Sequence, residues 1–301
     1  MPAFAAVAAD PRFRVVAVVT APPRPAGRSG ALAPTPVGAW AAAAGLPLLE
    51  IARVRDAESG DRLLALDVDG ALLADFGQIV PRRLLEGLGR GILNLHPSRL
   101  PRHRGASPIP ATLLAGDTAT AVATIQMDAG VDTGPIVALQ PAAVAPDDTA
   151  ETLEARLAGL AASGIGATLE AWLDGRISPV AQEEAGATLT GRLSRNDGRV
   201  GAGVPAATAY RTWRAYQPWP GAWVELADGT RLALVEVGPP RPAAGLPVGT
   251  LALDGDTLLL SLEGGALPLL RVLPAGGRAM GGGDFARGHA GLIGPHARIR
   301  A

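Results

Sequence analysis

The fold is decided by the stretch NLHPSRLPRHRGASPI, which occupies residues 94–109. The apolar run just before it, residues 91–93, predicts a buried β-strand that ends near His96. Asn94 and His96 stand two residues apart, so in a strand both side chains point from the same face. A proline-punctuated basic loop follows at once and ends the strand. The stretch therefore predicts a polar site at the end of a buried strand.

A second polar segment, DAGVDTG at residues 128–134, places Asp132 in a glycine-flanked turn. An oxyanion donor, an imidazole and a carboxylate that orients it are the parts needed to move an acyl group onto an amine. Asn94, His96 and Asp132 supply these groups, although a strand end alone could equally hold a core histidine. Asp128 could form a carboxylate pair or a metal site with Asp132, but we expect it to form an Asx turn.

The first part of the chain alternates strand and helix patterns. Residues 15–19 and 71–74 are continuous apolar runs, typical of strands buried on both faces. Between them, Thr35 and Pro36 begin a helical pattern that ends at Gly45. This alternation predicts an α/β fold with a mostly parallel sheet that carries catalytic residues at its strand ends. No glycine-rich dinucleotide fingerprint follows any of the predicted strands.

The second part of the chain has a different pattern. Residues 176–198 are polar and irregular, which predicts a linker. Beyond the linker, short strand patterns recur with turn signals between them, as is typical of a small barrel. Trp213, Trp219 and Trp223 are expected in its core rather than as stacking platforms. The predicted strands cover residues 223–226, 231–237, 251–253, 258–262 and 269–273.

Composition limits the classes of function. Of the 301 residues, 48% are hydrophobic and 18% are charged, which suffices for two folded domains. The chain has no cysteine, which excludes disulfides, thiol catalysis and zinc–thiolate sites and fits a cytoplasmic protein. No apolar run reaches the roughly 18 residues of a membrane-spanning helix, so we expect no membrane association.

Charge is unevenly distributed along the chain. Residues 1–190 carry 15 arginines against 20 acidic residues, whereas residues 191–301 carry 12 against 8. The chain contains no lysine, so any phosphate contacts must be made by guanidinium groups. A basic distal part permits RNA binding without establishing it.

The order and spacing of these motifs resemble the folate-dependent formyltransferase superfamily, whose signature joins an Asn-x-His strand end, a proline-rich loop ending in Arg-Gly, and a later Asp turn. The resemblance runs nearly end to end and is strongest to the methionyl-tRNA formyltransferases. Departures occur at Arg99, His103 and Ala121, where Leu, an aromatic residue and Gly are usual. Three further motifs carry the resemblance: RPAGR at 24–28, DFGQIVP at 75–81 and PWPGAW at 218–223.

The resemblance implies two domains. A Rossmann-like formyltransferase domain would cover residues 1–176, a linker 177–196, and an OB-like β-barrel that binds tRNA 197–301. The implied activity is transfer of a formyl group from 10-formyltetrahydrofolate to the amino group of methionyl initiator tRNA. The protein is expected to be a cytoplasmic monomer.

The resemblance also assigns roles to the polar trio. Asn94 would donate its amide to the formyl oxygen as that oxygen becomes an oxyanion, and His96 would assist. Asp132 would orient His96 and take the proton that leaves the attacking amine, directly or through water. The chemistry needs no metal, and the sequence shows no metal-ligand cluster.

Further residues are implied in binding. The basic loop could contact the acceptor end of a tRNA or the glutamate tail of folate, or be ordinary solvated surface. In the family the insertion that matches residues 24–28 wedges into the tRNA acceptor stem, although a flexible linker would look the same. The tRNA-binding set is Arg24, Arg28, Arg99, Arg102 and Arg104. The folate-binding set is Phe76, Gly77, Ser98, Leu100, Pro101, Gly130 and Gly134.

Three other functions share parts of this pattern. A nucleotide-sugar N-formyltransferase has the same trio and can carry the same Pro-Trp-Pro-Gly barrel. A formyltetrahydrofolate deformylase also shares the trio but lacks a distal barrel. A catalytically impaired RNA-binding homologue is the third, and the intact trio argues against it.

The beginning of the chain carries its own expectation. Family members open with a short apolar strand before a turn whose tail matches residues 2–4, so the first strand is expected to be missing. A helix over residues 3–9 and a strand over 14–20 would then be the first helix and the second strand. In the sheet order 3-2-1-4-5-6 the first strand is central, and its neighbours would keep unpaired backbone groups. We therefore expect either a strand encoded upstream or a poorly stable protein.

Overall fold

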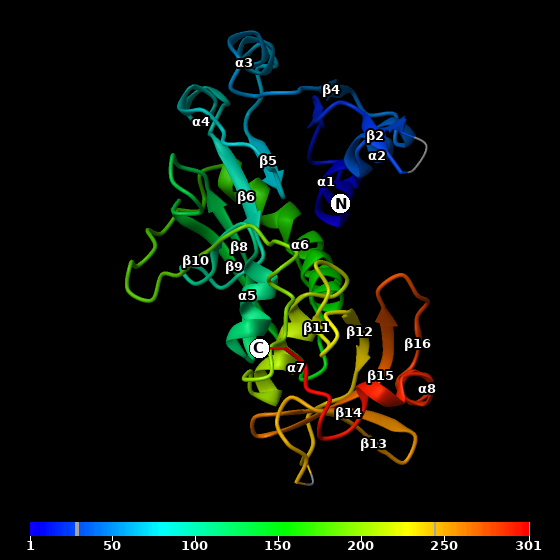
Figure 1. Cartoon of the computed structure of the whole chain (residues 1–301). Helices are drawn as coiled ribbons and strands as arrows, with labels where there is room; N and C mark the ends of the chain where they lie inside the picture. The colour runs from blue at the N-terminus through cyan, green and yellow to red at the C-terminus, as the bar shows by residue number, and fades with distance from the viewer. Residues whose placement is uncertain (28–29, 244, 301) are drawn as a thin grey trace. The chain divides into compact units, whose positions relative to one another are not determined.

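The computed structural model describes residues 1–27, 30–243 and 245–300, shown in Figure 1. The chain divides into two compact units, and each unit is assembled from three separate stretches of chain. The first unit comprises Met1–Pro108, Ala119–Ala143 and Glu154–Thr190. The second unit comprises Ile109–Thr118, Val144–Leu153 and Gly191–Ala301.

The main sheet of the first unit has four strands in the order β5-β6-β8-β9. Strand β6 is parallel to β5 and antiparallel to β8, and β9 is antiparallel to β8, so the sheet is mixed. The strands are β5 (Ala71–Ala74), β6 (Ile92–His96), β8 (Ala119–Gln126) and β9 (Ile136–Ala143). A separate parallel pair joins β1 (Val18–Thr20) to β4 (Leu48–Glu50). The α/β class predicted from the sequence is confirmed.

Strand β6 is buried on both faces, as its apolar sequence predicts. Leu93 belongs to a core cluster with Leu169 and Trp172, which lie on the long helix α6 (Ala150–Leu173). Ile92 belongs to a different cluster that includes Leu84. Because successive side chains of a strand point to opposite faces, Asn94 and His96 share the face of Ile92.

Helices α1 to α4 also lie in the first unit. The Thr35 hydroxyl accepts a hydrogen bond of 3.0 Å from the Gly38 N–H, so the predicted N-cap is present. The helices are α1 (Pro2–Ala9), α2 (Pro36–Ala43), α3 (Ala57–Leu64) and α4 (Arg82–Gly87). Within the described ranges, none of the helices is both long and apolar enough to cross a membrane.

Two small strand pairs complete the first unit. Strand β2 (Arg24–Ala26) pairs antiparallel with β3 (Ala31–Ala33), in a region whose sequence shows no strand pattern. Strand β7 (Arg104–Gly105) pairs in parallel with β10 (Leu189–Thr190). The residues of β10 come from the stretch whose polar sequence predicts a linker.

The second unit is built on an antiparallel sheet with the strand order β11-β12-β15-β14-β13, and β16 pairs with β15. Its core includes Val224, Leu260 and Phe285. The predicted second β domain is confirmed as an all-antiparallel sheet. The strands are β11 (Trp223–Glu225), β12 (Arg231–Val237), β13 (Leu251–Asp254), β14 (Thr257–Leu262), β15 (Gly265–Pro274) and β16 (Met280–Gly281).

Helices accompany this antiparallel sheet. The core of the second unit takes in Ala209, on α7, and Ala286, on α8. Trp223 is buried and Trp213 packs against the core, as predicted, but Trp219 is exposed. The second-unit helices are α7 (Ala206–Ala215), α8 (Gly282–Gly288) and the short 3-10 turn Ala290–Leu292, while α5 (Pro108–Ala115) lies mainly in this unit.

Candidate active site

Two polar side chains, Asn94 and His96, lie at the carboxyl end of the buried strand β6. Asn94 is 8% exposed and His96 is 4% exposed. On the neighbouring strand β8 they pair with Ile125 and Ala123, which keep this part of the sheet apolar. The strand therefore presents an amide and an imidazole from one face at its carboxyl end.

The turn between β8 and β9 is fixed by Asp128. The Oδ1 atom of Asp128 accepts hydrogen bonds from the Gly130 N–H (3.0 Å) and the Thr133 hydroxyl (2.8 Å). This arrangement confirms that Asp128 is an Asx turn residue. A Cβ at Gly134 would collide with the carbonyl oxygen of Gln126, so the turn needs glycine there for its own close packing.

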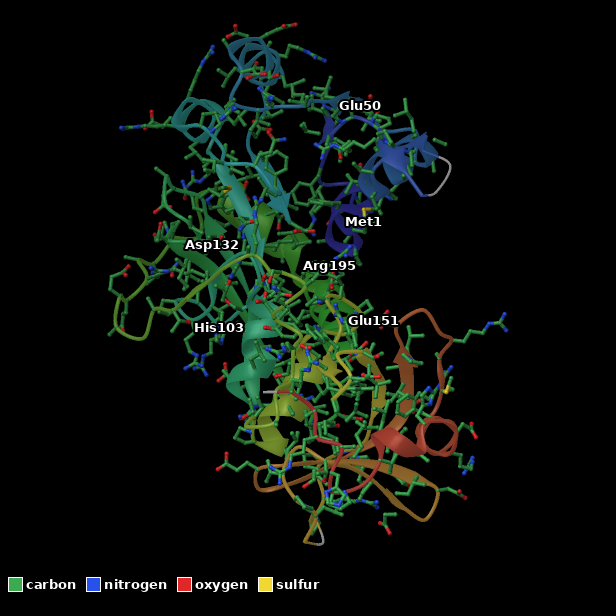
Figure 2. The ribbon with its side chains drawn as sticks, in the orientation of Figure 1. Met1, Glu50, His103, Asp132, Glu151 and Arg195 are labelled. Atoms are coloured by element: carbon green, nitrogen blue, oxygen red, sulfur yellow. The ribbon has the colours of Figure 1, made fainter. Side chains whose placement is uncertain are left out.

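The turn carries Asp132 to the end of β6. The Asn94 amide donates to Asp132 Oδ1 across 3.3 Å, and His96 Nδ1 lies 3.5 Å from Asp132 Oδ2. The Gly105 N–H also donates to Oδ2, across 2.8 Å. Asp132 itself adopts a left-handed backbone conformation with φ of 51°. The structure thus brings together the three residues that the sequence predicts as a catalytic trio; Figure 2 labels Asp132 and His103 in this unit.

The protonation of His96 follows from its neighbours. Its Nε2 atom lies 2.9 Å from the carbonyl oxygen of His103, which can only accept a hydrogen bond. Nε2 must therefore carry a hydrogen, and in a neutral imidazole Nδ1 then faces the Asp132 carboxylate without one. An additional proton placed between Nδ1 and Asp132 Oδ2 would complete a hydrogen bond.

The residues predicted to bind folate occupy different environments. Ser98 is fully buried, and its hydroxyl donates to the Arg102 carbonyl across 2.7 Å. Leu100 packs in an apolar cluster with Ala123 and Ile125. Both therefore support the loop from within, whereas Pro101 is partly exposed.

Phe76 and Gly77 follow β5 after one intervening residue, Asp75. Strands β5 and β6 are parallel, with Ala74 opposite Leu95. The residues after β5 therefore lie at the same end of the sheet as Asn94 and His96, beyond the carboxyl ends of the two strands. Phe76 is partly buried and Gly77 is exposed. Open α/β sheets bind their ligands beyond the carboxyl ends of their strands.

The arginines predicted to contact tRNA divide into two groups. Arg99 and Arg102 are exposed on the loop after β6, and Arg24 is exposed on β2. Arg104, in contrast, is only 6% exposed. Its guanidinium binds Gln182 and Glu184, an arrangement that argues against a direct contact with RNA. Arg28 lies outside the described residues.

Sequence reasoning missed the segment 180–190. The Gln182 amide donates to the backbone carbonyls of Asp132 and Gly134, both across 2.7 Å. The Arg104 N–H donates to the Thr188 carbonyl across 2.9 Å. The alternation Ala187-Thr188-Leu189-Thr190 is a weak strand signal at most, so the polar sequence around it reads as a linker.

One pKa shift and one observation on metal ligands complete the description of the site. Hydrogen bonding and attraction from the Arg104 guanidinium hold the pKa of the Glu184 carboxyl below its ordinary value. Across the described ranges, no three or more His, Asp or Glu side chains are grouped to hold a metal ion.

The sequence and the fold have counterparts among known proteins. Residues 6–169 match the formyl transferase family and residues 192–290 match the formyl transferase C-terminal domain family. In a crystal structure of HypX from Aquifex aeolicus in complex with tetrahydrofolic acid, a similar fold gives a TM-score of 0.56 at 18% identity, over 75% of this chain and 39% of that chain.

Curated relatives match over most of the chain. The methionyl-tRNA formyltransferase of Myxococcus xanthus (strain DK1622) is 37% identical over 91% of this chain and 88% of its own length. That of Acidiphilium cryptum (strain JF-5) is 40% identical over 93% of this chain and 90% of its own length. The chain belongs to the methionyl-tRNA formyltransferase family.

Proposed function

We propose that this protein transfers the formyl group of 10-formyltetrahydrofolate to the α-amino group of methionyl initiator tRNA. The single observation that carries the proposal is the convergence of Asn94, His96 and Asp132 at the end of β6. The curated relatives bear the name of this activity and align over 91% and 93% of the chain.

The geometry suits each step of the transfer. The amine nitrogen attacks the formyl carbon, and the formyl oxygen gains negative charge as the tetrahedral adduct forms. Asn94 has two amide hydrogens and spends one on Asp132, so the other can stabilise this oxygen. A buried donor in a site that excludes water is worth more than the same donor in water.

We assign the proton transfer to Asp132. The attacking amine must lose a proton before the adduct collapses forward, and Asp132 is the carboxylate within reach of Asn94. The Nε2 atom of His96 is engaged by the His103 carbonyl and its Nδ1 faces Asp132, so we assign His96 the support of Asp132 rather than direct contact with substrate. When the bond from the formyl carbon to the folate nitrogen breaks, that nitrogen takes the proton and tetrahydrofolate leaves.

The substrates would bind beyond the carboxyl ends of β5 and β6. We place the folate beside the loop after β5, where Phe76 and Gly77 lie, and beside the turn that holds Gly130 and Gly134. The exposed arginines Arg99, Arg102 and Arg24 would contact tRNA phosphates. The protein is proposed to act in the cytoplasm as a monomer.

The direct test uses purified protein with 10-formyltetrahydrofolate and methionyl initiator tRNA. We expect formylmethionyl-tRNA, detected by acid gel or mass spectrometry of the released amino acid. Parallel reactions contain methionyl elongator tRNA, an amino-sugar nucleotide, or no acceptor. Formylation of the sugar alone would establish the nucleotide-sugar alternative, and formate release without an acceptor would establish a deformylase. Binding of tRNA without any product would indicate an impaired homologue.

A further inference from the structure

The segment 180–190 is joined to the catalytic turn by a chain of polar contacts. The Gln182 side-chain nitrogen donates to two backbone carbonyl oxygens of the turn, those of Asp132 and Gly134. Both distances are 2.7 Å, so both amide hydrogens are used. An amide NH₂ group offers two donors, which is the number that this pair of carbonyls requires.

The other end of the Gln182 amide is also held. Its Oε1 atom accepts from Nε and from an Nη of Arg104, at 3.1 and 2.9 Å. The same guanidinium donates to both carboxylate oxygens of Glu184, at 3.2 and 3.0 Å. A planar guanidinium that serves two acceptors in this way fixes which end of the amide is oxygen and which is nitrogen.

Arg104 gains its position from the same segment. Its backbone N–H donates to the Thr188 carbonyl, and its own carbonyl accepts from the Thr190 hydroxyl across 3.0 Å. The next residue, Gly105, donates its N–H to the Asp132 carboxylate. The segment thus reaches Asp132 by two routes, one to its backbone through Gln182 and one to its side chain through the Arg104–Gly105 strand.

The hydrogen bond from Gln182 restrains Asp132, whose backbone conformation is unfavourable without such a restraint. A residue other than glycine with positive φ is in a region that costs free energy unless its surroundings hold it there, and Asp132 has φ of 51°. The carbonyl of Asp132 is the group that Gln182 binds. Loss of that hydrogen bond would release the residue whose carboxylate must face both Asn94 and His96.

We propose that Gln182, oriented by Arg104, is a positioning residue that holds Asp132 in the geometry required for formyl transfer. The proposal rests on the proposed function, because it assigns Gln182 no contact with substrate and lets it act only through Asp132. The segment 180–190, which carries Gln182, accordingly contributes to catalysis and is not merely a linker.

The test compares variants that keep the volume of the side chain. Gln182→Met removes both donors, whereas Gln182→Glu keeps the acceptors for Arg104 and turns an oxygen toward two carbonyls. Glu183→Gln is the matched control, because its side chain is exposed on the same segment. For both Gln182 variants we expect kcat to fall about 10- to 100-fold, the range for misplacement of a catalytic group. We expect KM for either substrate to stay within about 3-fold, since no substrate contact is removed.

A second measurement separates positioning from general damage. In an Asp132→Asn background, Gln182→Met should lower kcat by less than about 3-fold, because residues that act as one unit are non-additive. Hydrogen exchange of residues 128–134 should be faster in Gln182→Met and unchanged in Glu183→Gln. The melting temperature and circular dichroism of each variant show whether it is folded.

Each outcome decides the matter. Equal loss of kcat in the wild-type and Asp132→Asn backgrounds, or a Gln182→Met protein within about 2-fold of wild type, would overturn the positioning role. If Asp132→Asn is itself nearly as active as wild type, the assignment of Asp132 fails, and that failure is visible in the single variant. If the wild-type protein formylates no methionyl-tRNA, the proposed function fails independently of Gln182.

Discussion

The backbone N–H of Gly105 donates a 2.8 Å hydrogen bond to the Oδ2 atom of Asp132, 27 residues away in the sequence. The same oxygen faces His96 Nδ1, and the other carboxylate oxygen faces the Asn94 amide. One carboxylate oxygen thus lies between the Gly105 N–H and His96, and the other accepts from Asn94. The two oxygens have distinct neighbours, so the carboxylate cannot rotate without loss of at least one contact.

Asp132→Asn is the first prediction. The substitution keeps the shape of the side chain and removes the proton acceptor, so we expect kcat to fall by at least about 10²-fold. The amide can keep an oxygen toward the Gly105 N–H, so the fold should be retained. Measurement of initial formylation rates at saturating substrates checks this. A variant with nearly normal kcat would contradict the role given to Asp132.

Gly105→Ala is the second prediction. Gly105 has φ of 102°, and a Cβ there would meet the carbonyl oxygen of Thr190 across the β7–β10 pair. We expect a loss of about 1–3 kcal/mol in the free energy of unfolding, as for a strained non-glycine backbone, together with reduced kcat. Urea denaturation and formylation assays measure the two effects.

The control for this glycine is Gly159→Ala on α6. A Cβ at Gly159 meets nothing within 4 Å, and the residue lies in a helix. Alanine there should raise the free energy of unfolding by about 0.5–1 kcal/mol and leave kcat unchanged. If Gly105→Ala behaved as Gly159→Ala does, the close approach of β7 and β10 would not matter for the site.

The sequence predicts those parts of the site that depend on local periodicity. Asn94 and His96 are two residues apart in an apolar strand, and the shared face follows from strand geometry alone. Asp128 is also accessible to sequence reasoning, because its hydrogen bonds reach only two and five residues along the chain. Short-range patterns of this kind need no knowledge of the tertiary fold.

The segment 180–190 could not be predicted in the same way. Gln182 binds a carbonyl 50 residues before it, and Arg104 binds a side chain 78 residues after it. A polar side chain satisfied by distant backbone has the same local sequence as a solvated linker. The burial of Arg104 was missed for the same reason, because an arginine in a basic loop is most simply read as exposed.

Acid sensitivity of the Arg104–Glu184 contact is the third prediction. Because the pKa of Glu184 is lowered in the folded protein, this carboxylate stabilises the fold above its ordinary pKa of 4.5, and the contribution is lost as pH falls through the lowered value. Wild type should therefore be more resistant to urea than Glu184→Gln at pH 7, and the difference should shrink below about pH 4.5. A difference that grows on acidification would contradict the assignment.

The fourth prediction concerns Arg99 and Arg102, the exposed arginines of the loop after β6. Removal of both Arg99 and Arg102 by alanine should weaken tRNA binding, because each phosphate contact releases counterions from the RNA. The slope of log affinity against log salt should become shallower by up to about 1.5, and affinity for folate should not change. Arg62→Ala removes an exposed charge on α3 of the same unit and serves as the control. Titrations of methionyl-tRNA at several salt concentrations measure the slope. An unchanged slope in the double variant would show that these guanidinium groups do not contact the tRNA backbone.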